Sequence, residues 1–277
     1  MTNEVALGRL LSARGVASRR KAEKLIFDGM VTVDGALAEH PAMLVDPSRN
    51  KVVIDSVPLP DEQELRYYLL YKTKGCITGR DDPQGRKSIF DLMPEMKVRV
   101  EPVGRLDFDT EGALLLTNDG TLAHALAHPS RMVPKRYRVK VWKTPSEMIL
   151  KKIRAGKVYL EDGVVPACKV RVLDATDGGN AWVEITVTEG RNRLIRRLFD
   201  QMGHPVSKLR RESFATIALR DMQRGEIRAL TGDEINRLRD QAAGKRPESS
   251  GKKKYGKGYA RPKPKKPRHG RRKPRRQ

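Results

Sequence analysis

Two segments of this chain alternate between apolar and polar residues, and that pattern constrains the fold more than any other feature. In residues 135–141 a basic side chain follows each apolar one, and in residues 181–187 valine and isoleucine alternate with glutamate and threonine. Because successive side chains of a strand point to opposite faces, each segment predicts a strand with one buried face. Helical patterns lie between the strands without a regular βαβ repeat. The sequence therefore predicts an α+β fold with a mixed, largely antiparallel sheet.

Helical spacing of apolar residues marks the elements between these strands. Residues 191–202 carry leucine, isoleucine, phenylalanine and methionine on one side of a predicted helix, and Gly203 ends it. Residues 147–155 predict a second helix, and residues 122–127 predict a short one that ends before Pro129. Residues 67–71 predict a strand, and residues 78–88 form a polar loop.

The first residues predict a small separate module, residues 3–60. Leucines at helical spacing indicate a first helix that Gly15 ends, and Ser18 is placed to cap a second helix that Gly29 stops. A short strand and an Asp34-Gly35 hairpin turn follow. This order of helix, Gly-x-x-Ser-Arg-Arg, helix and strand resembles the S4 RNA-binding domain. The resemblance implies that four basic residues contact RNA: Arg14, Arg19, Arg20 and Lys24. On charge alone, these side chains could equally serve to solvate two surface helices.

Positive charge is unevenly distributed over the chain. The net charge is +23, and residues 244–277 carry sixteen lysines and arginines against one acid. This segment lacks apolar periodicity, so it predicts a disordered basic tail. A polyanion is the partner that such a composition favours. Cys76 and Cys168 lie far apart, which argues against a disulfide framework or a thiolate zinc site.

A polar turn followed by an apolar block occupies residues 104–120, GRLDFDTEGALLLTNDG. The block predicts a buried strand, and the turn before it presents the carboxylate of Asp107. The run resembles the active-site signature of the RsuA/RluB group of pseudouridine synthases, which isomerise uridine within RNA. Within that group it is most similar to the enzymes that modify large-subunit RNA, and the resemblance spans residues 5–240. One departure is Lys72-Thr73-Lys74-Gly75, where relatives carry Lys-Pro-x-Gly.

The resemblance implies the roles of the candidate site residues. Asp107 is the expected catalytic aspartate, Tyr137 the tyrosine that stacks on the target base, and Arg196 the cation that pairs with Asp107. Arg193 or Arg197 remains an alternative partner. The expected RNA-contacting residues near the site are Arg105, Arg191, Asn192 and Ile195.

The predicted function is therefore conversion of a uridine to pseudouridine in ribosomal RNA, with the catalytic domain at residues 61–243. The reaction is redox-neutral and needs no cofactor or metal. Large-subunit RNA is the expected substrate, and small-subunit or transfer RNA, or a non-catalytic role in ribosome assembly, are the alternatives. A cytoplasmic monomer that binds ribosomal RNA or a pre-ribosomal particle, with no membrane partner, is the simplest expectation.

Overall fold

The computed structural model describes residues 3–80, 82–96, 98–175 and 179–245. These residues form one compact unit. Most of the predicted basic tail, from residue 246 onward, lies outside the described residues. None of the helices described in these ranges is long and apolar enough to cross a membrane.

The N-terminal domain combines two helices with short strands. Helix α1 (Leu7–Ala13) and helix α2 (Arg19–Phe27) pack beside two small sheets. One has four strands in the order β3-β2-β5-β6, and the other is the β1-β4 pair. These strands are β1 (Val5–Ala6), β2 (Val31–Val33), β3 (Ala36–Leu37), β4 (Leu44–Val45), β5 (Val52–Ile54) and β6 (Val57–Pro58). The Ser18 hydroxyl accepts the Lys21 amide hydrogen, which confirms the predicted cap. Asp34 and Gly35 both have positive φ, as a tight hairpin turn requires.

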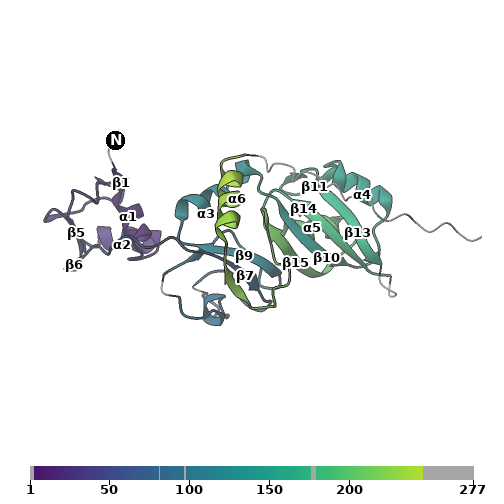
Figure 1. Cartoon of the computed structure of the whole chain (residues 1–277). Helices are drawn as coiled ribbons and strands as arrows, with labels where there is room; N and C mark the ends of the chain where they lie inside the picture. The colour runs from purple at the N-terminus through teal and green to yellow at the C-terminus, as the bar shows by residue number, and fades with distance from the viewer. Residues whose placement is uncertain (1–2, 81, 97, 176–178, 246–277) are drawn as a thin grey trace, which may run out of the picture. The chain divides into compact units, whose positions relative to one another are not determined.

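A nine-stranded sheet forms the centre of the second domain, in the order β13-β14-β10-β15-β9-β7-β17, with β8 on β9 and β16 on β15 (Figure 1). The strands are β7 (Tyr67–Lys72), β8 (Glu101–Pro102), β9 (Glu111–Thr117), β10 (Lys135–Val141), β13 (Lys169–Ala175), β14 (Ala181–Val187), β15 (Val206–Phe214), β16 (Ile217–Ala218) and β17 (Ile227–Ala229). Strands β10 and β14 have the predicted bounds. The predicted α+β class with a mostly antiparallel sheet is confirmed.

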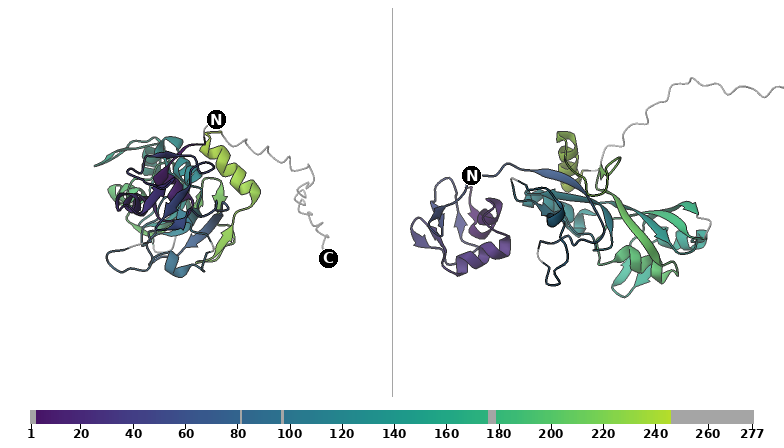
Figure 2. Two further views of the ribbon diagram at one scale, coloured as in Figure 1. Left: turned by 90° about the vertical axis from the view of Figure 1, so that its left-hand side faces the viewer. Right: turned by 90° about the horizontal axis from the view of Figure 1, so that it is seen from below.

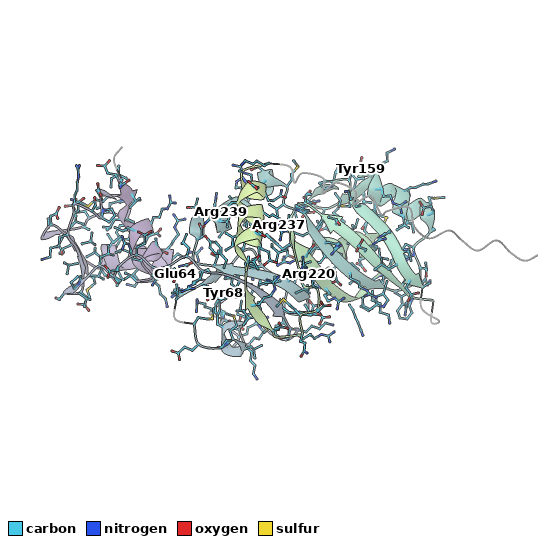
Figure 3. All side chains as sticks on the ribbon, viewed as in Figure 1. Glu64, Tyr68, Tyr159, Arg220, Arg237 and Arg239 are labelled. Atoms are coloured by element: carbon cyan, nitrogen blue, oxygen red, sulfur yellow. The ribbon has the colours of Figure 1, made fainter. Side chains whose placement is uncertain are left out.

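Helices and one hairpin complete this domain. The helices are α3 (Gly120–Ala127), α4 (Glu147–Arg154), α5 (Leu194–Gln201) and α6 (Gly232–Ala242), with single 3-10 turns η1 (Phe90–Leu92) and η2 (Pro129–Arg131). Strands β11 (Val158–Leu160) and β12 (Gly163–Val165) form a separate hairpin, on which Tyr159 is 70% exposed (Figure 3).

The helices cover the two faces of the sheet unequally. Buried residues of α4 and α5 pack in one cluster with the inward side chains of β10, β14 and β13. Buried residues of α3 and α6 pack in another cluster, over β7 and β9. Figure 2 (right) shows α6 and α5 on opposite faces of the sheet. On α6, which Figure 3 marks by Arg237 and Arg239, the Arg239 guanidinium donates to the Tyr67 hydroxyl at 3.2 Å.

Strands β9 and β15 form a parallel pair at the middle of the sheet, where Gly112 lies opposite Arg211. A Cβ on Gly112 would lie 2.3 Å from the Arg211 carbonyl oxygen, and its φ is +127°. Arg211 is buried, and its Nε donates to the Ala113 carbonyl at 2.6 Å. Only glycine therefore allows the two strands to approach so closely.

The predicted helix over residues 191–202 begins three residues later than expected, at Leu194. Arg193 has a left-handed backbone conformation, with φ of 48°. Residues 191–193 are therefore a loop, and the apolar stripe that begins at Leu194 marks the true start of the helix.

Candidate active site

The loop between β8 and β9 carries Asp107, and a buried lysine holds its backbone. Lys72 is 1% exposed, and its ammonium donates to the carbonyl oxygens of Thr73, Asp107 and Thr110 at 2.9, 3.1 and 3.0 Å. Burial lowers the pKa of Lys72, while the nearby Asp107 and Asp109 carboxylates oppose that shift. The Thr110 amide also donates to the Asp107 carbonyl at 3.1 Å. The backbone on either side of the half-buried Asp107 is thus fixed.

The segment after β7 makes further bonds to the same loop. The Thr78 hydroxyl donates to the Leu106 carbonyl at 2.7 Å and accepts the Leu106 amide at 3.1 Å. The Gly75 amide donates to the Phe108 carbonyl at 2.9 Å. Residues on both sides of Asp107 are therefore bonded to one neighbouring segment, which gives the carboxylate a rigid support.

Helix α5 reaches the loop from its other side, through Asp109 instead of Asp107. Arg196 contacts the Asp109 carboxylate at 2.8 Å, and Arg193 lies 3.7 Å from its other oxygen. The expected Arg196–Asp107 pair is thus replaced by an Arg196–Asp109 pair. The turn at residues 107–110 directs the Asp109 side chain to α5, and the arginine spacing alone could not reveal this. Arg197 pairs elsewhere, with Asp162 at 2.7 Å.

Several buried polar atoms around this pair have no hydrogen-bond partner among the described residues: Asp109 Oδ1, Thr110 Oγ1 and Arg196 Nε. The Arg196 side chain is 12% exposed. Buried polar atoms in folded proteins are almost always bonded, so these atoms can accept hydrogen bonds from, or donate them to, water or a bound substrate.

Tyr137 and Ile195 lie in the same apolar cluster as Leu106, the neighbour of Asp107. Tyr137 is 9% exposed on β10, and Ile195 is 5% exposed on α5. The loop of Asp107, the tyrosine strand and the first turn of α5 thus contribute to one extended apolar cluster, although they come from three distant parts of the sequence.

Arg105 lies at the rim of an open pocket of about 500 Å³. Two segments line the pocket. The first contributes residues 77–79, 82, 83 and 86, and the second contributes residues 102, 104 and 105. Arg86 pairs with Asp82 at 2.8 Å, which lowers the pKa of Asp82 to about 2, and its guanidinium lies 5.8 Å from the ring centre of Phe108. Two guanidiniums beside the Asp107 loop suit phosphate groups that flank a bound nucleotide.

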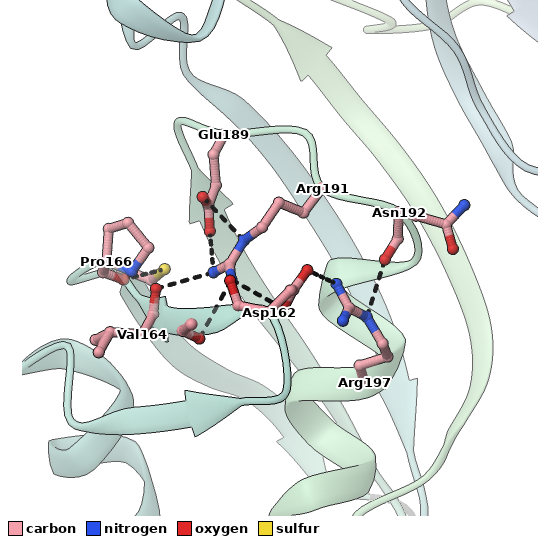
Figure 4. A network of polar contacts seen from close by, with 9 residues as sticks. Asp162, Val164, Pro166, Glu189, Arg191, Asn192 and Arg197 are labelled. Carbon is pink, nitrogen blue, oxygen red and sulfur yellow. Dashed lines mark hydrogen bonds and ion pairs between the residues drawn. The ribbon is translucent and has the colours of Figure 1, made fainter.

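Arg191, which was expected to contact RNA, is instead bonded to acceptors within the protein (Figure 4). It pairs with Glu189 at 2.7 Å and with Asp162 at 3.0 Å, and it donates to the carbonyls of Gly163 and Val164. Its Nε and both terminal nitrogens are engaged with protein acceptors. The guanidinium fixes the β11–β12 hairpin to the loop before α5, while the Asn192 carbonyl accepts from Arg197 at 2.9 Å.

The predicted basic residues of the N-terminal domain lie on or beside its two helices. Arg19 and Arg20 are exposed at the start of α2. Lys24 pairs with Asp28 at 2.6 Å, and both side chains are largely exposed. Arg14, which caps the end of α1, donates to the Pro60 carbonyl at 3.3 Å. An exposed pair contributes little stability, so Lys24 can exchange Asp28 for a phosphate at low cost.

Comparisons with known proteins identify the two domains. Residues 66–201 match the family model for RNA pseudouridylate synthases, and residues 7–50 match the S4 domain model. The "ribosomal large subunit pseudouridine synthase B" of Bacillus subtilis (strain 168) is 39% identical over 234 residues, covering 84% of this chain and 95% of that protein. The protein of the same name from Salmonella typhi is 39% identical over 239 residues, covering 84% and 81%.

A solved structure shows the same fold. A crystal structure of a pseudouridylate synthase aligns with a TM-score of 0.61 at 25% identity, covering 84% of this chain and 98% of the other. The chain belongs to the RNA pseudouridine synthase family. It is an RNA pseudouridine synthase, an isomerase, with an N-terminal S4 domain.

Lys72 is the site residue for which the sequence suggested no role. Lysine is among the residues most rarely buried in folded proteins, so a lysine at the end of a predicted strand is expected to face water. Its burial depends on carbonyl oxygens that come from residues 107 and 110. The resemblance of residues 72–75 to the family's Lys-Pro-x-Gly segment marked the position of Lys72, but it did not predict that the side chain is buried.

Proposed function

We propose that this enzyme converts one uridine of large-subunit ribosomal RNA to pseudouridine, with Asp107 as the acting carboxylate and without a cofactor. The observation that carries the proposal is the loop held by Lys72 on one side and by Arg196 on the other. Two relatives of high coverage are named for the large subunit, which supports this choice of substrate over small-subunit or transfer RNA.

The reaction needs one fixed anion. The bond between the ribose C1′ and the base N1 breaks, the base turns, and a bond forms between C1′ and C5 while the C5 proton leaves. The freed N1 takes up a proton in exchange for the one lost from C5, so the product is an isomer of the substrate and no co-reactant is required. Attack at C1′, addition at C6, and a glycal route all use an ionised carboxylate beside the sugar or base, which is the role of Asp107.

Neighbouring residues serve the same step. The target base must leave its stack to reach a partly buried carboxylate. The Tyr137 ring provides an apolar surface for the extruded base, and Ile195 lies in the same cluster. Arg105 and Arg86 bind flanking phosphates at the pocket. The exposed basic residues of the S4 domain dock RNA outside the pocket, and we propose that the enzyme acts as a cytoplasmic monomer.

The test is to map pseudouridines in all ribosomal and transfer RNAs of cells with and without the gene. We expect one large-subunit site to disappear and to return with the wild-type gene but not with an Asp107→Asn gene. Loss of a site in another RNA would overturn the substrate, and an unchanged map would overturn the function.

A further inference from the structure

Among the described residues, no helix packs on one face of strands β13, β14, β10 and β15. The helices that pack on these strands, α4 and α5, contribute to the cluster that contains Tyr137. Helices α3 and α6 lie on the other face, but they pack over β7 and β9. In Figure 1 these four strands are seen with no described helix in front of them, while α6 stands in front of the neighbouring strands.

Strand pairing places the outward side chains of this face in three rows. The first row is Lys208, Lys140, Trp182 and Asp174; the second is Arg210, Arg138, Glu184 and Arg171; the third is Ser213, Arg136, Thr186 and Lys169. We call these twelve residues the basic ladder. It contains seven basic side chains and two acids, and neighbouring strands lie about 4.8 Å apart. All of its residues are exposed or half-buried.

Like charges face each other directly in two rows of the basic ladder. Lys140 lies opposite Lys208, and Arg138 lies opposite Arg210. Such pairs destabilise a sheet relative to neutral ones. A face that served only to meet water would gain stability from neutral or opposite charges at these positions. Glu212 already pairs with Arg210 at 2.6 Å, but no described carboxylate pairs with Lys140 or Lys208. The repulsion between these two lysines therefore indicates that an anion offsets it in the working protein.

The second row also contains an arginine, Arg138, whose guanidinium is held in one orientation by a neighbouring aromatic ring. The Arg138 guanidinium lies 4.8 Å from the Trp182 ring centre, and its buried Nε has no hydrogen-bond partner among the described residues. Stacking on an aromatic ring fixes the plane of a guanidinium, so its terminal nitrogens are oriented before an acceptor arrives.

We propose that the basic ladder is a second RNA-binding surface, which binds the phosphate backbone of ribosomal RNA outside the target nucleotide. Because Tyr137 alternates with Arg136 and Arg138, the basic ladder lies on the opposite face of the sheet from Tyr137. One RNA segment can thus occupy the site while another crosses the basic ladder. The inference rests on the proposed function only in taking ribosomal RNA as the polyanion.

The experiment compares two triple variants of the full-length chain. Lys140→Gln/Lys169→Gln/Lys208→Gln removes three charges from the basic ladder. Lys151→Gln/Lys152→Gln/Lys157→Gln removes three charges from exposed positions on or just after α4. Affinity for a transcribed large-subunit RNA domain of several hundred nucleotides is measured by filter binding across a salt series.

The ladder variant should show a salt slope shallower by about 2–3 log units per log unit of salt. Between about 50 and 200 mM salt, the ratio of wild-type affinity to variant affinity should therefore fall by roughly sixteen- to sixtyfold. The control variant should keep the wild-type slope. The ladder variant should also unfold at the same temperature as wild type or higher, because it loses the Lys140–Lys208 repulsion.

Equal slopes for the two variants, or a ladder variant with wild-type affinity at all salt concentrations, would overturn the proposal. Turnover of a short stem-loop at saturating concentration serves as a separate measurement. If wild type does not turn over any RNA, the proposed function fails, while the binding comparison still decides the role of the basic ladder.

Discussion

Two arginine–carboxylate systems flank helix α5, and they differ in how completely their polar atoms are bonded. In the first, Arg191 and Arg197 hold Asp162, and every nitrogen of Arg191 has a protein acceptor. In the second, Arg196 holds Asp109, and both residues retain a buried polar atom without a hydrogen-bond partner among the described residues. Residues 191–197 supply the arginines of both systems.

The difference separates structure from function within one motif. A fully bonded network stabilises the fold and has no donors left for a substrate. An incompletely bonded one costs stability and persists where binding completes it. We therefore expect changes in the first network to affect unfolding, and changes in the second to affect the reaction.

The largest expected effect is at the loop that the second network supports. Asp107→Asn keeps the shape of the side chain but removes its charge, so turnover should fall by at least about a thousandfold. RNA affinity should stay within a few-fold of wild type. Single-turnover release of tritium from 5-tritiated uridine in RNA measures the rate.

Asp119→Asn is the matched control for this variant. Asp119 lies in the same sequence motif, where it caps α3 through the Leu122 amide and accepts the Tyr67 hydroxyl. The Asp119→Asn variant should have a lower unfolding temperature than wild type, and its folded form should turn over RNA at nearly the wild-type rate. Substantial turnover by Asp107→Asn would remove that residue from the reaction.

The second prediction concerns Arg196 itself. Arg196→Met should slow turnover by roughly a hundredfold, since the Asp109 side of the loop loses its support. If Arg196 acts through Asp109, then Asp109→Asn should give a similar loss, and the double variant should lose little more. Additive losses would show that Arg196 acts directly on the substrate or on Asp107. Arg193→Met, which removes only the longer 3.7 Å contact to the same carboxylate, should give a smaller loss than Arg196→Met.

The third prediction tests the fully bonded network. Arg191→Met leaves Glu189 and the Val164 carbonyl without their donor and leaves Asp162 with Arg197 alone, so it should lower the free energy of unfolding by about 2–3 kcal/mol. Urea denaturation measures this loss. RNA affinity at a temperature where the variant is folded should match wild type. A large drop in affinity without loss of stability would restore Arg191 as an RNA contact.

The smallest effect is expected at a bonded network remote from the site. In α6, Glu234 accepts from Arg228 and completes a capping box with Thr231, and the Arg228 contact lowers its pKa from 4.5 to about 2. A lowered acid pKa stabilises the fold above the unfolded-state value and loses that contribution as pH falls. At pH ~7, the free energy of unfolding of wild type should be higher than that of Glu234→Gln by about 1–2 kcal/mol. The gap should narrow below a pH of about 4.5, and a gap independent of pH would contradict the assignment.

Local patterns predicted the elements well and the contacts of the site less well. Strand β10 follows its alternation, and Ser18 caps α2, because both depend on neighbouring residues. The partner of Arg196 depends on how the turn at residues 107–110 directs two carboxylates, which sequence spacing does not specify. Similarly, the donors of Arg191 are used by a hairpin some 30 residues earlier in the chain.

Some missed features had a signal and others had none. Thr231 and Glu234 stand three apart before an apolar pattern, which is the signature of a capping box and could have predicted α6. The burial of Lys72 has no such local mark, because it depends on Asp107 and Thr110 arriving from another segment.

The close approach of Gly112 and Arg211 has a consequence for how the enzyme is made. The strand that follows the Asp107 loop cannot be seated against its parallel neighbour until residues almost a hundred positions later have been synthesised. Contacts of such long sequence separation form late in folding. A nascent chain that ends before β15 would leave β9 without its parallel neighbour directly after the Asp107 loop, so competence for the reaction would arise near the end of translation.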